Sequence, residues 1–124
     1  MAKYVIICFL LINSATAFGQ YAEFDFLKRT HKFDPAEEGV VLEHQYTFTN
    51  SGDEPLIISE YKVACTCTQV EFPKKPILPG ESGVIKLTFD TEGKIGWQYR
   101  TIELHANVKK SPYKLEFRVK VLNE

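Results

Sequence analysis

Much of the chain alternates between apolar and polar residues with a period of two. In the clearest stretch, residues 40–50, one side of an extended chain would carry Val40, Leu42, His44, Tyr46 and Phe48. Successive side chains of a strand point to opposite faces, so this pattern predicts a β-strand with one buried face. Residues 114–121 alternate in the same way and predict a second such strand at the end of the chain.

Shorter stretches with the same period fill the region between residues 22 and 113. They cover residues 22–26, 31–34, 56–61, 63–72, 85–89 and 101–106. Glycine, proline and asparagine residues that favour turns separate them, as in Asn50–Asp53 and Pro79–Gly83. No stretch of helical length carries the apolar stripe of an amphipathic helix. The sequence therefore predicts an all-β fold, an immunoglobulin-like antiparallel β-sandwich of about seven strands, with a barrel as the alternative.

The first residues have the pattern of a secretory signal peptide. Lys3 gives a positive start, residues 4–12 form an apolar run, and Ala15–Ala17 fits the pattern of small residues at a cleavage site. A membrane-spanning helix needs about 20 apolar residues, and this run is much shorter. We therefore predict a cleaved signal peptide over residues 1–17. The two candidate cleavage points are after Ala17 and after Gly19.

The rest of the chain, residues 18–124, has a length suited to one domain with its own core. The whole chain carries 15 Lys and Arg residues against 16 Asp and Glu residues, a balance that excludes a strongly basic nucleic-acid-binding protein. Its 44% hydrophobic and 25% charged residues are not typical of a disordered protein. No second long apolar run follows the predicted leader. We therefore expect an exported mature chain, soluble in the periplasm or outside the cell, without an integral membrane segment.

Three segments follow one another in a recognisable order. They are Asn50–Leu56, Ala64–Thr68 and Pro76–Gly80. They resemble the turn Asn-Thr-Gly-Asp-x-Pro-Leu, the segment small-Cys-x-Cys-Thr and the turn Pro-Ile-x-Pro-Gly of the bacterial domain-of-unknown-function 1573 family (DUF1573). Ser51 replaces the Thr of the first motif, and Thr66 stands where Gly is common. The resemblance covers residues 22–122. It implies an exported immunoglobulin-like domain, akin to the Hydin and major sperm protein sandwiches, and no established biochemical activity.

Cys65 and Cys67 form the one chemically unusual motif after the leader. If they lie on a β-strand, both side chains project from the same face and the two sulfurs are neighbours. Three interpretations remain open: a local disulfide that is structural or redox-active, a thiolate pair for a soft metal such as Cu(I), or two packed small side chains. An oxidising compartment favours the disulfide. A metal site would also need a histidine. His44 is the candidate, although its apolar strand face favours a hydrogen-bonded core histidine.

We expect no enzymatic activity. The sequence contains no G-x-S-x-G motif, no H-E-x-x-H motif and no phosphate-cradling glycine loop. We therefore predict a non-catalytic module of the bacterial cell envelope that needs no cofactor and binds an unidentified protein or cell-surface component. The alternative is a thiol-redox or copper-handling periplasmic protein that uses Cys65 and Cys67.

Loops at one end of the sandwich are the expected contact surface. The three loops are Asn50–Pro55, Pro73–Gly83 and Asp90–Trp97, and their candidate contact residues are Asp53, Lys74, Lys75 and Trp97. We expect Trp97 to plug one end of the sandwich, with stacking on a ligand as the alternative. The polar side of the last strand carries Lys114, Glu116, Arg118 and Lys120. This pattern is typical of a solvated sheet face or a guarded edge, and the alternative is a patch for an acidic glycan or a membrane surface.

Overall fold

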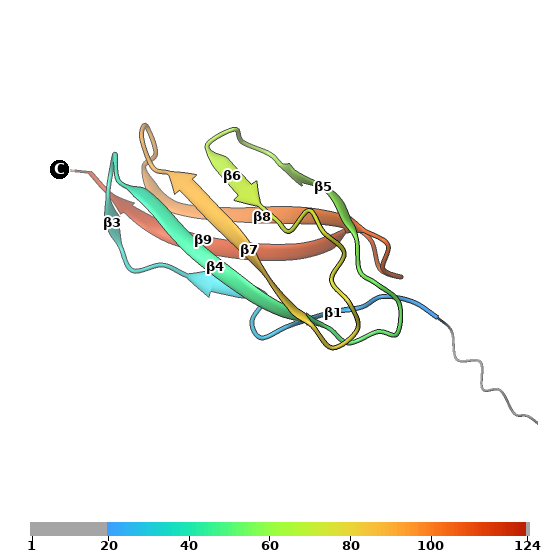
Figure 1. Cartoon of the computed structure of the whole chain (residues 1–124). Helices are drawn as coiled ribbons and strands as arrows, with labels where there is room; N and C mark the ends of the chain where they lie inside the picture. The colour runs from blue at the N-terminus through green and yellow to red at the C-terminus, as the bar shows by residue number, and fades with distance from the viewer. Residues whose placement is uncertain (1–19, 124) are drawn as a thin grey trace, which may run out of the picture.

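The structure, a computed structural model, describes residues 20–123, and all of their regular elements are β-strands. Nine strands form two sheets that pack face to face as a β-sandwich (Figure 1). The predicted signal peptide and both predicted cleavage points lie outside the described residues. Within residues 20–123, no helix is long and apolar enough to cross a membrane.

The first sheet has four strands and is antiparallel throughout. Its spatial order is β1 (Phe24–Phe26), β4 (Val41–Asn50), β7 (Ser82–Asp90) and β6 (Thr68–Glu71). The predicted alternation of β4 is present, because Tyr46 and Phe48 are buried and Thr47 between them is exposed. Val40 differs from the prediction: it precedes the strand and is exposed, since β4 begins one residue later.

The second sheet has five strands. Its spatial order is β2 (Thr30–Lys32), β9 (Tyr113–Leu122), β8 (Gly96–Ala106) and β5 (Ile58–Val63), and β3 (Ala36–Glu37) also pairs with β9. The β8–β9 pair is antiparallel, whereas β2 and β3 run parallel to β9. In the register of β8 and β9, Trp97 lies opposite Lys120 and Tyr99 lies opposite Arg118.

The N-terminal stretch changes sheets, which explains why there are more strands than the predicted seven. β1 pairs with β4 in the first sheet, and the chain then crosses so that β2 and β3 pair with β9 in the second. A side-chain hydrogen bond supports this crossing, because the Tyr46 hydroxyl of β4 donates to the Glu116 carbonyl of β9 over 2.7 Å. The stretches predicted at residues 22–26 and 31–34 correspond to β1 and β2, and β3 is an additional short strand.

The inward faces of the two sheets meet in one hydrophobic core that is rich in aromatic rings. Its largest fully buried apolar side chains are Tyr46, Phe48, Phe89, Phe117, Leu56, Ile85, Leu87, Ile102, Leu104, Leu115 and Val119. Phe89 of the first sheet packs edge-on against Phe117 of the second, with ring centroids 5.1 Å apart. Full burial of each such side chain stabilises the fold by about 1.5–3 kcal/mol. The predicted sandwich is confirmed, and the two separate sheets do not close into a barrel.

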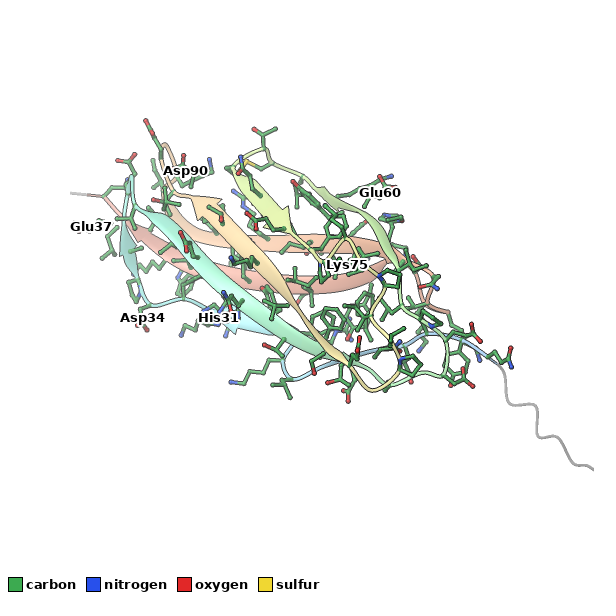
Figure 2. The ribbon with its side chains drawn as sticks, in the orientation of Figure 1. His31, Asp34, Glu37, Glu60, Lys75 and Asp90 are labelled. Atoms are coloured by element: carbon green, nitrogen blue, oxygen red, sulfur yellow. A yellow bond between two sulfur atoms is a disulfide. The ribbon has the colours of Figure 1, made fainter. Side chains whose placement is uncertain are left out.

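The three predicted contact loops lie at opposite ends of the sandwich. Thr49 pairs with Ser82, so the loops 51–57 and 72–81 leave β4 and β6 at one end. Asp90 pairs with Val41 at the other end of the same strands, where the loop 91–95 begins. Figure 2 shows the same separation between Lys75 and Asp90. The prediction of one contact surface made from all three loops is therefore wrong, because the strand β7 separates them.

Candidate functional site

The cysteine pair lies in the connection that leads from β5 in one sheet to β6 in the other. Cys65 and Cys67 form a disulfide with Cα atoms 5.1 Å apart. The Thr68 amide donates to the Cys65 carbonyl over 3.1 Å, which closes a tight turn, and the Asp90 amide donates to the Cys67 carbonyl over 2.9 Å. The prediction that both cysteines lie on a strand is wrong, because the chain must leave one sheet at this point to join the other. The disulfide interpretation is confirmed, but the disulfide forms within a turn and not along a strand.

The structure does not bring His44 to the cysteines. His44 lies opposite Leu87 of β7, and Leu87 in turn lies opposite Val70 of β6, so the histidine and the cysteine turn are on different strands. Two strand spacings alone separate them by roughly 10 Å of sheet. Among residues 20–123, no three His, Cys, Asp or Glu side chains are grouped to hold a metal ion. The predicted set of Cys65, Cys67 and His44 is therefore not assembled as a metal site in this part of the chain.

His44 instead stacks on a second histidine. The His31 ring of β2 lies parallel to the His44 ring of β4, with centroids 3.6 Å apart and planes inclined by 10°. Phe33 packs edge-on against His31, and Tyr46 packs edge-on against His44. Figure 2 places His31 on the side of the sandwich where β2 meets β4. The pair therefore joins the two sheets through ring contacts, which differ from the hydrogen-bonded core histidine expected at residue 44.

Both imidazoles of this pair resist protonation. Burial lowers the pKa of His44, and the neighbouring His31 lowers it further. Burial also lowers the pKa of His31, with a further lowering from Lys28 and an opposing effect from Asp34. Two protonated rings stacked this closely would repel each other, so the stack favours neutral imidazoles.

Asn50 connects its own turn to two other segments at one end of the sandwich. Its side chain is fully buried, and its amide nitrogen donates to the carbonyls of Glu54 and Ile77 over 2.8 and 2.9 Å. Its amide oxygen accepts from the backbone N–H groups of Glu23 and Gly52 over 3.2 and 2.9 Å. Buried polar side chains persist when all of their hydrogen bonds are made, and those of Asn50 are. Asn50 therefore has a structural role.

The polar loop candidates also have local contacts. The Asp53 carboxylate accepts from the Tyr21 amide over 2.8 Å and thereby holds the N-terminal segment against the loop. The Lys74 ammonium lies 3.6 Å from the centre of the Phe72 ring, and Lys75 is exposed beside it. Asp53 is therefore engaged within the fold, whereas the two lysines remain on the surface.

Trp97 lies on a strand and does not plug the sandwich. It is the second residue of β8, it points to the outer face of the five-stranded sheet, and it is 45% exposed. Tyr99 projects from the same face two residues later and is 66% exposed. The two rings stack with centroids 6.0 Å apart and planes inclined by 22°. The expectation of a plug is wrong, because the strand begins at Gly96 and the alternation turns Trp97 outward.

Three cations surround this aromatic pair, and we call the five residues Trp97, Tyr99, Lys32, Arg118 and Lys120 the aromatic–basic patch. In the strand register, Lys120 lies opposite Trp97 and Arg118 lies opposite Tyr99. Lys32 of β2 lies opposite Arg118 on its other side. The Lys32 ammonium lies 5.8 Å from the centre of the Trp97 ring. Three neighbouring strands therefore contribute to one surface.

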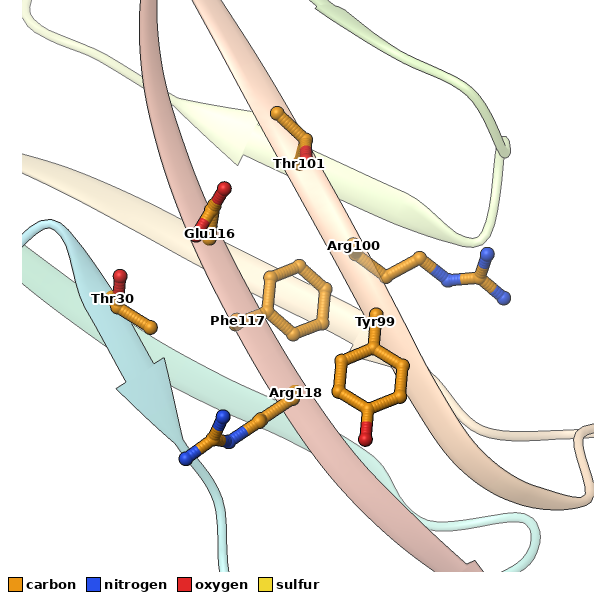
Figure 3. A pocket seen from close by; sticks show the side chains of 7 residues that line it. All are labelled: Thr30, Tyr99, Arg100, Thr101, Glu116, Phe117 and Arg118. Atoms are coloured by element: carbon orange, nitrogen blue, oxygen red, sulfur yellow. The ribbon is translucent and has the colours of Figure 1, made fainter.

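A small hollow of about 180 Å³ adjoins the patch (Figure 3). Tyr99 and Thr101 of β8, Glu116 and Arg118 of β9, and Thr30 of β2 lie around it, as Figure 3 shows. Hydroxyl groups, a carboxylate and a guanidinium therefore border the exposed tyrosine ring. Such groups can donate and accept hydrogen bonds with a polar ligand that lies on the sheet.

Sequence reasoning did not identify Tyr99 and Lys32 as site residues. The sequence does contain a signal for Tyr99. The polar side of the strand predicted at residues 101–106 begins at Thr101, and the same alternation extends towards the N-terminus through Tyr99 and Trp97. Lys32 is different, because its place beside Arg118 depends on the parallel pairing of β2 with β9. That pairing joins segments far apart in the chain, and alternation within one segment does not specify it.

The fold is similar to solved structures of low sequence identity. A protein of unknown function from Porphyromonas gingivalis W83 has a TM-score of 0.64 and 18% identity, over 85% of this chain and 47% of that one. The PapD-like (ASH) domain 7 of human CEP192 has a TM-score of 0.57 and 11% identity, over 95% and 96% of the two chains. The secreted serine protease VesC from Vibrio cholerae has a TM-score of 0.61 and 12% identity, over 80% of this chain.

These similarities concern the fold alone. The chain spans 23% of the VesC chain and 31% of the VesB protease chain, another Vibrio cholerae structure that it resembles. No protein with a curated description matches the sequence. The family described as "Protein of unknown function (DUF1573)" matches residues 24–121, which include almost all of the sandwich. The resemblance found in the sequence is thereby confirmed, and the chain belongs to the DUF1573 family.

Proposed function

We propose that this protein is a non-catalytic binding module of the bacterial cell envelope. The observation that carries the proposal is the aromatic–basic patch on the outer face of the five-stranded sheet. Exposed tryptophan and tyrosine side chains are enriched where proteins contact partners, because they combine a large apolar surface with a polar group. Two such rings stacked beside three cations form a surface suited to binding.

The engagement of the more reactive groups supports a non-catalytic role. The sulfurs of Cys65 and Cys67 are bonded to each other, and the rings of His31 and His44 are stacked on each other. The hydrogen-bonding groups of Asn50 all hold backbone segments. These groups stabilise the sandwich, and the exposed patch is left for contacts with other molecules.

The disulfide supports the envelope as the location. Disulfides persist in oxidising compartments such as the bacterial periplasm and the cell surface, and are rare in the cytosol. The leader predicted from the sequence is consistent with the same compartment. Intact-mass measurement of the protein purified from cells that express the full sequence tests export, because removal of the leader lowers the mass by a defined amount.

Binding to the envelope itself tests the proposed function. The purified protein is mixed with isolated bacterial envelopes that lack it, and the fraction that sediments with them is measured. We expect retention that falls at least several-fold in the double variant Trp97→Ala/Tyr99→Ala and stays unchanged in Lys74→Ala/Lys75→Ala, at a loop of the sandwich. Equal retention of all three proteins, or no retention of any, would contradict the proposal.

A further inference from the structure

We infer that the aromatic–basic patch binds a polysaccharide that carries carboxylate groups, such as a polymer of uronic acids. The inference rests on the proposed function and names the class of ligand for the same site. A sugar ring would lie on the aromatic pair, and its carboxylate would face the cations. Each part of this arrangement follows from the positions of the described side chains.

The aromatic pair is an exposed stack. Trp97 and Tyr99 come from one strand and stack on each other, with planes inclined by 22° and centroids 6.0 Å apart, and Tyr99 is 66% exposed. The axial C–H groups of a sugar ring are weakly positive, and they pack against the electron-rich face of an aromatic ring. The exposed Tyr99 ring offers this contact to a sugar at the open side of the stack. An exposed ring of this kind can hold a sugar without a deep pocket.

The charge of the patch favours an anionic ligand. Lys32, Arg118 and Lys120 are all exposed. Within residues 20–123, the one contact at ion-pair distance joins Glu103 and His105, so none of these three cations has a carboxylate within that distance. Three acids flank the patch: Glu116 lies two residues before Arg118, Asp34 lies two residues after Lys32, and Glu37 lies opposite Leu122. The patch itself holds three cations and no acid, so its positive charge is local, and complementary charge steers an anionic polymer to it.

The shape of the patch favours a sugar over a peptide or a lipid surface. The adjoining hollow is small, about 180 Å³, and is bordered by the hydroxyl groups of Thr30 and Thr101. A peptide that anchors through apolar side chains needs a groove to bury them, whereas hydroxyl-bearing sugars can pair with threonine, arginine and glutamate on an open sheet. The Trp97 ring contacts Tyr99 on one strand and has the Lys32 ammonium 5.8 Å from its centre, so its neighbours on the sheet hold it, unlike a membrane-inserting side chain that projects without contacts.

Trp97 is the only tryptophan of the sequence, so its fluorescence reports directly on the patch. We would titrate the purified protein with oligogalacturonate and, separately, with neutral dextran and with vesicles of phosphatidylglycerol and phosphatidylcholine. We expect a saturable change of Trp97 fluorescence with oligogalacturonate that weakens as sodium chloride rises from about 50 to about 500 mM. Affinity at least about tenfold lower for dextran is expected. No response to oligogalacturonate, equal affinity for dextran, or stronger binding to vesicles would overturn the inference.

Two variants keep the reporter and test the two parts of the patch. Tyr99→Ala removes the more exposed of the two rings, and Arg118→Gln removes the central cation. Each should weaken oligogalacturonate binding about five- to tenfold, which corresponds to about 1–1.4 kcal/mol. Lys74→Gln, on a loop that is not part of the patch, is the matched control and should bind as the unchanged protein does. Unchanged affinity in both patch variants would overturn the inference. Envelope retention that depends on Trp97 and Tyr99 without any binding of oligogalacturonate would refute this ligand class alone and leave the binding module intact.

Discussion

Replacement of Asn50 by alanine tests whether the hydrogen bonds of the Asn50 side chain stabilise the fold. The side chain of Asn50 makes four hydrogen bonds to backbone groups of Glu23, Gly52, Glu54 and Ile77. Alanine would leave two N–H groups and two carbonyls without these partners. A lost hydrogen bond costs about 1 kcal/mol when water can replace it and about 1–3 kcal/mol when the orphaned group stays buried. The contact with Ile77 is fully buried and the other three are partly buried, so we expect a loss of about 3–5 kcal/mol.

This loss is a large part of the roughly 5–15 kcal/mol that stabilises a domain. Urea unfolding of the purified protein, followed by far-ultraviolet circular dichroism, measures it as a lower midpoint at an unchanged slope. Asn107→Ala is the matched control, since the exposed Asn107 side chain makes two hydrogen bonds, to Ile57 and Pro55. We expect its cost to be about 1 kcal/mol, because water can reach the freed groups. A cost below about 1 kcal/mol for Asn50→Ala would refute a structural role of this side chain.

Three further predictions concern stability. Gly52→Ala should cost about 1–3 kcal/mol in urea unfolding, because the added Cβ would lie 2.8 Å from the backbone of residues 22 and 23. Cys65→Ser/Cys67→Ser should cost only about 1.5 kcal/mol in the same assay, since the disulfide closes a loop of three residues and restricts the unfolded chain little. The urea midpoint should fall as the pH is lowered from about 7.5 to about 5, because burial lowers the pKa of His31 and His44 in the folded protein and the unfolded chain takes up more protons below about pH 6.5.

Each of these predictions has its own control. Ser51→Ala changes the neighbour of Gly52 without adding a clash, and an equal cost for both substitutions would contradict the close-approach explanation. A loss above about 4 kcal/mol on removal of both cysteines would contradict the small-loop estimate. His44→Gln should flatten the pH dependence, because it removes one ring of the stack. Identical pH profiles for this variant and the unchanged protein would refute the role of the stacked histidines.

The long strands could be predicted from the sequence because their pattern is local. The alternation over residues 40–50 gave β4 to within one residue, and that over residues 114–121 gave most of β9. Buried and exposed positions on one strand depend on which side each residue faces, and neighbouring residues reveal this. The family motifs were equally visible, since Asn50 and its turn are contiguous in the chain.

Features that join distant segments could not be predicted in this way. The turn at Cys65 and Cys67 exists because the chain passes between sheets there, and a β-rich composition hides such a crossing. The stack of His31 on His44 and the place of Lys32 beside Trp97 both depend on where the N-terminal stretch changes sheets. Sequence alternation leaves that register open, so the candidate site emerged only from the packed strands.

A chemical-shift map of the ¹⁵N-labelled protein tests the binding surface most directly. Spectra would be recorded with increasing amounts of soluble polysaccharide released from bacterial envelopes, with assigned amide and Trp97 indole signals. We predict that the shifts gather on the outer face of β8, β9 and β2, around Trp97, Tyr99 and Arg118. Shifts that gather on the loops 51–57 and 72–81 instead, or no shifts at saturating polysaccharide, would contradict this surface.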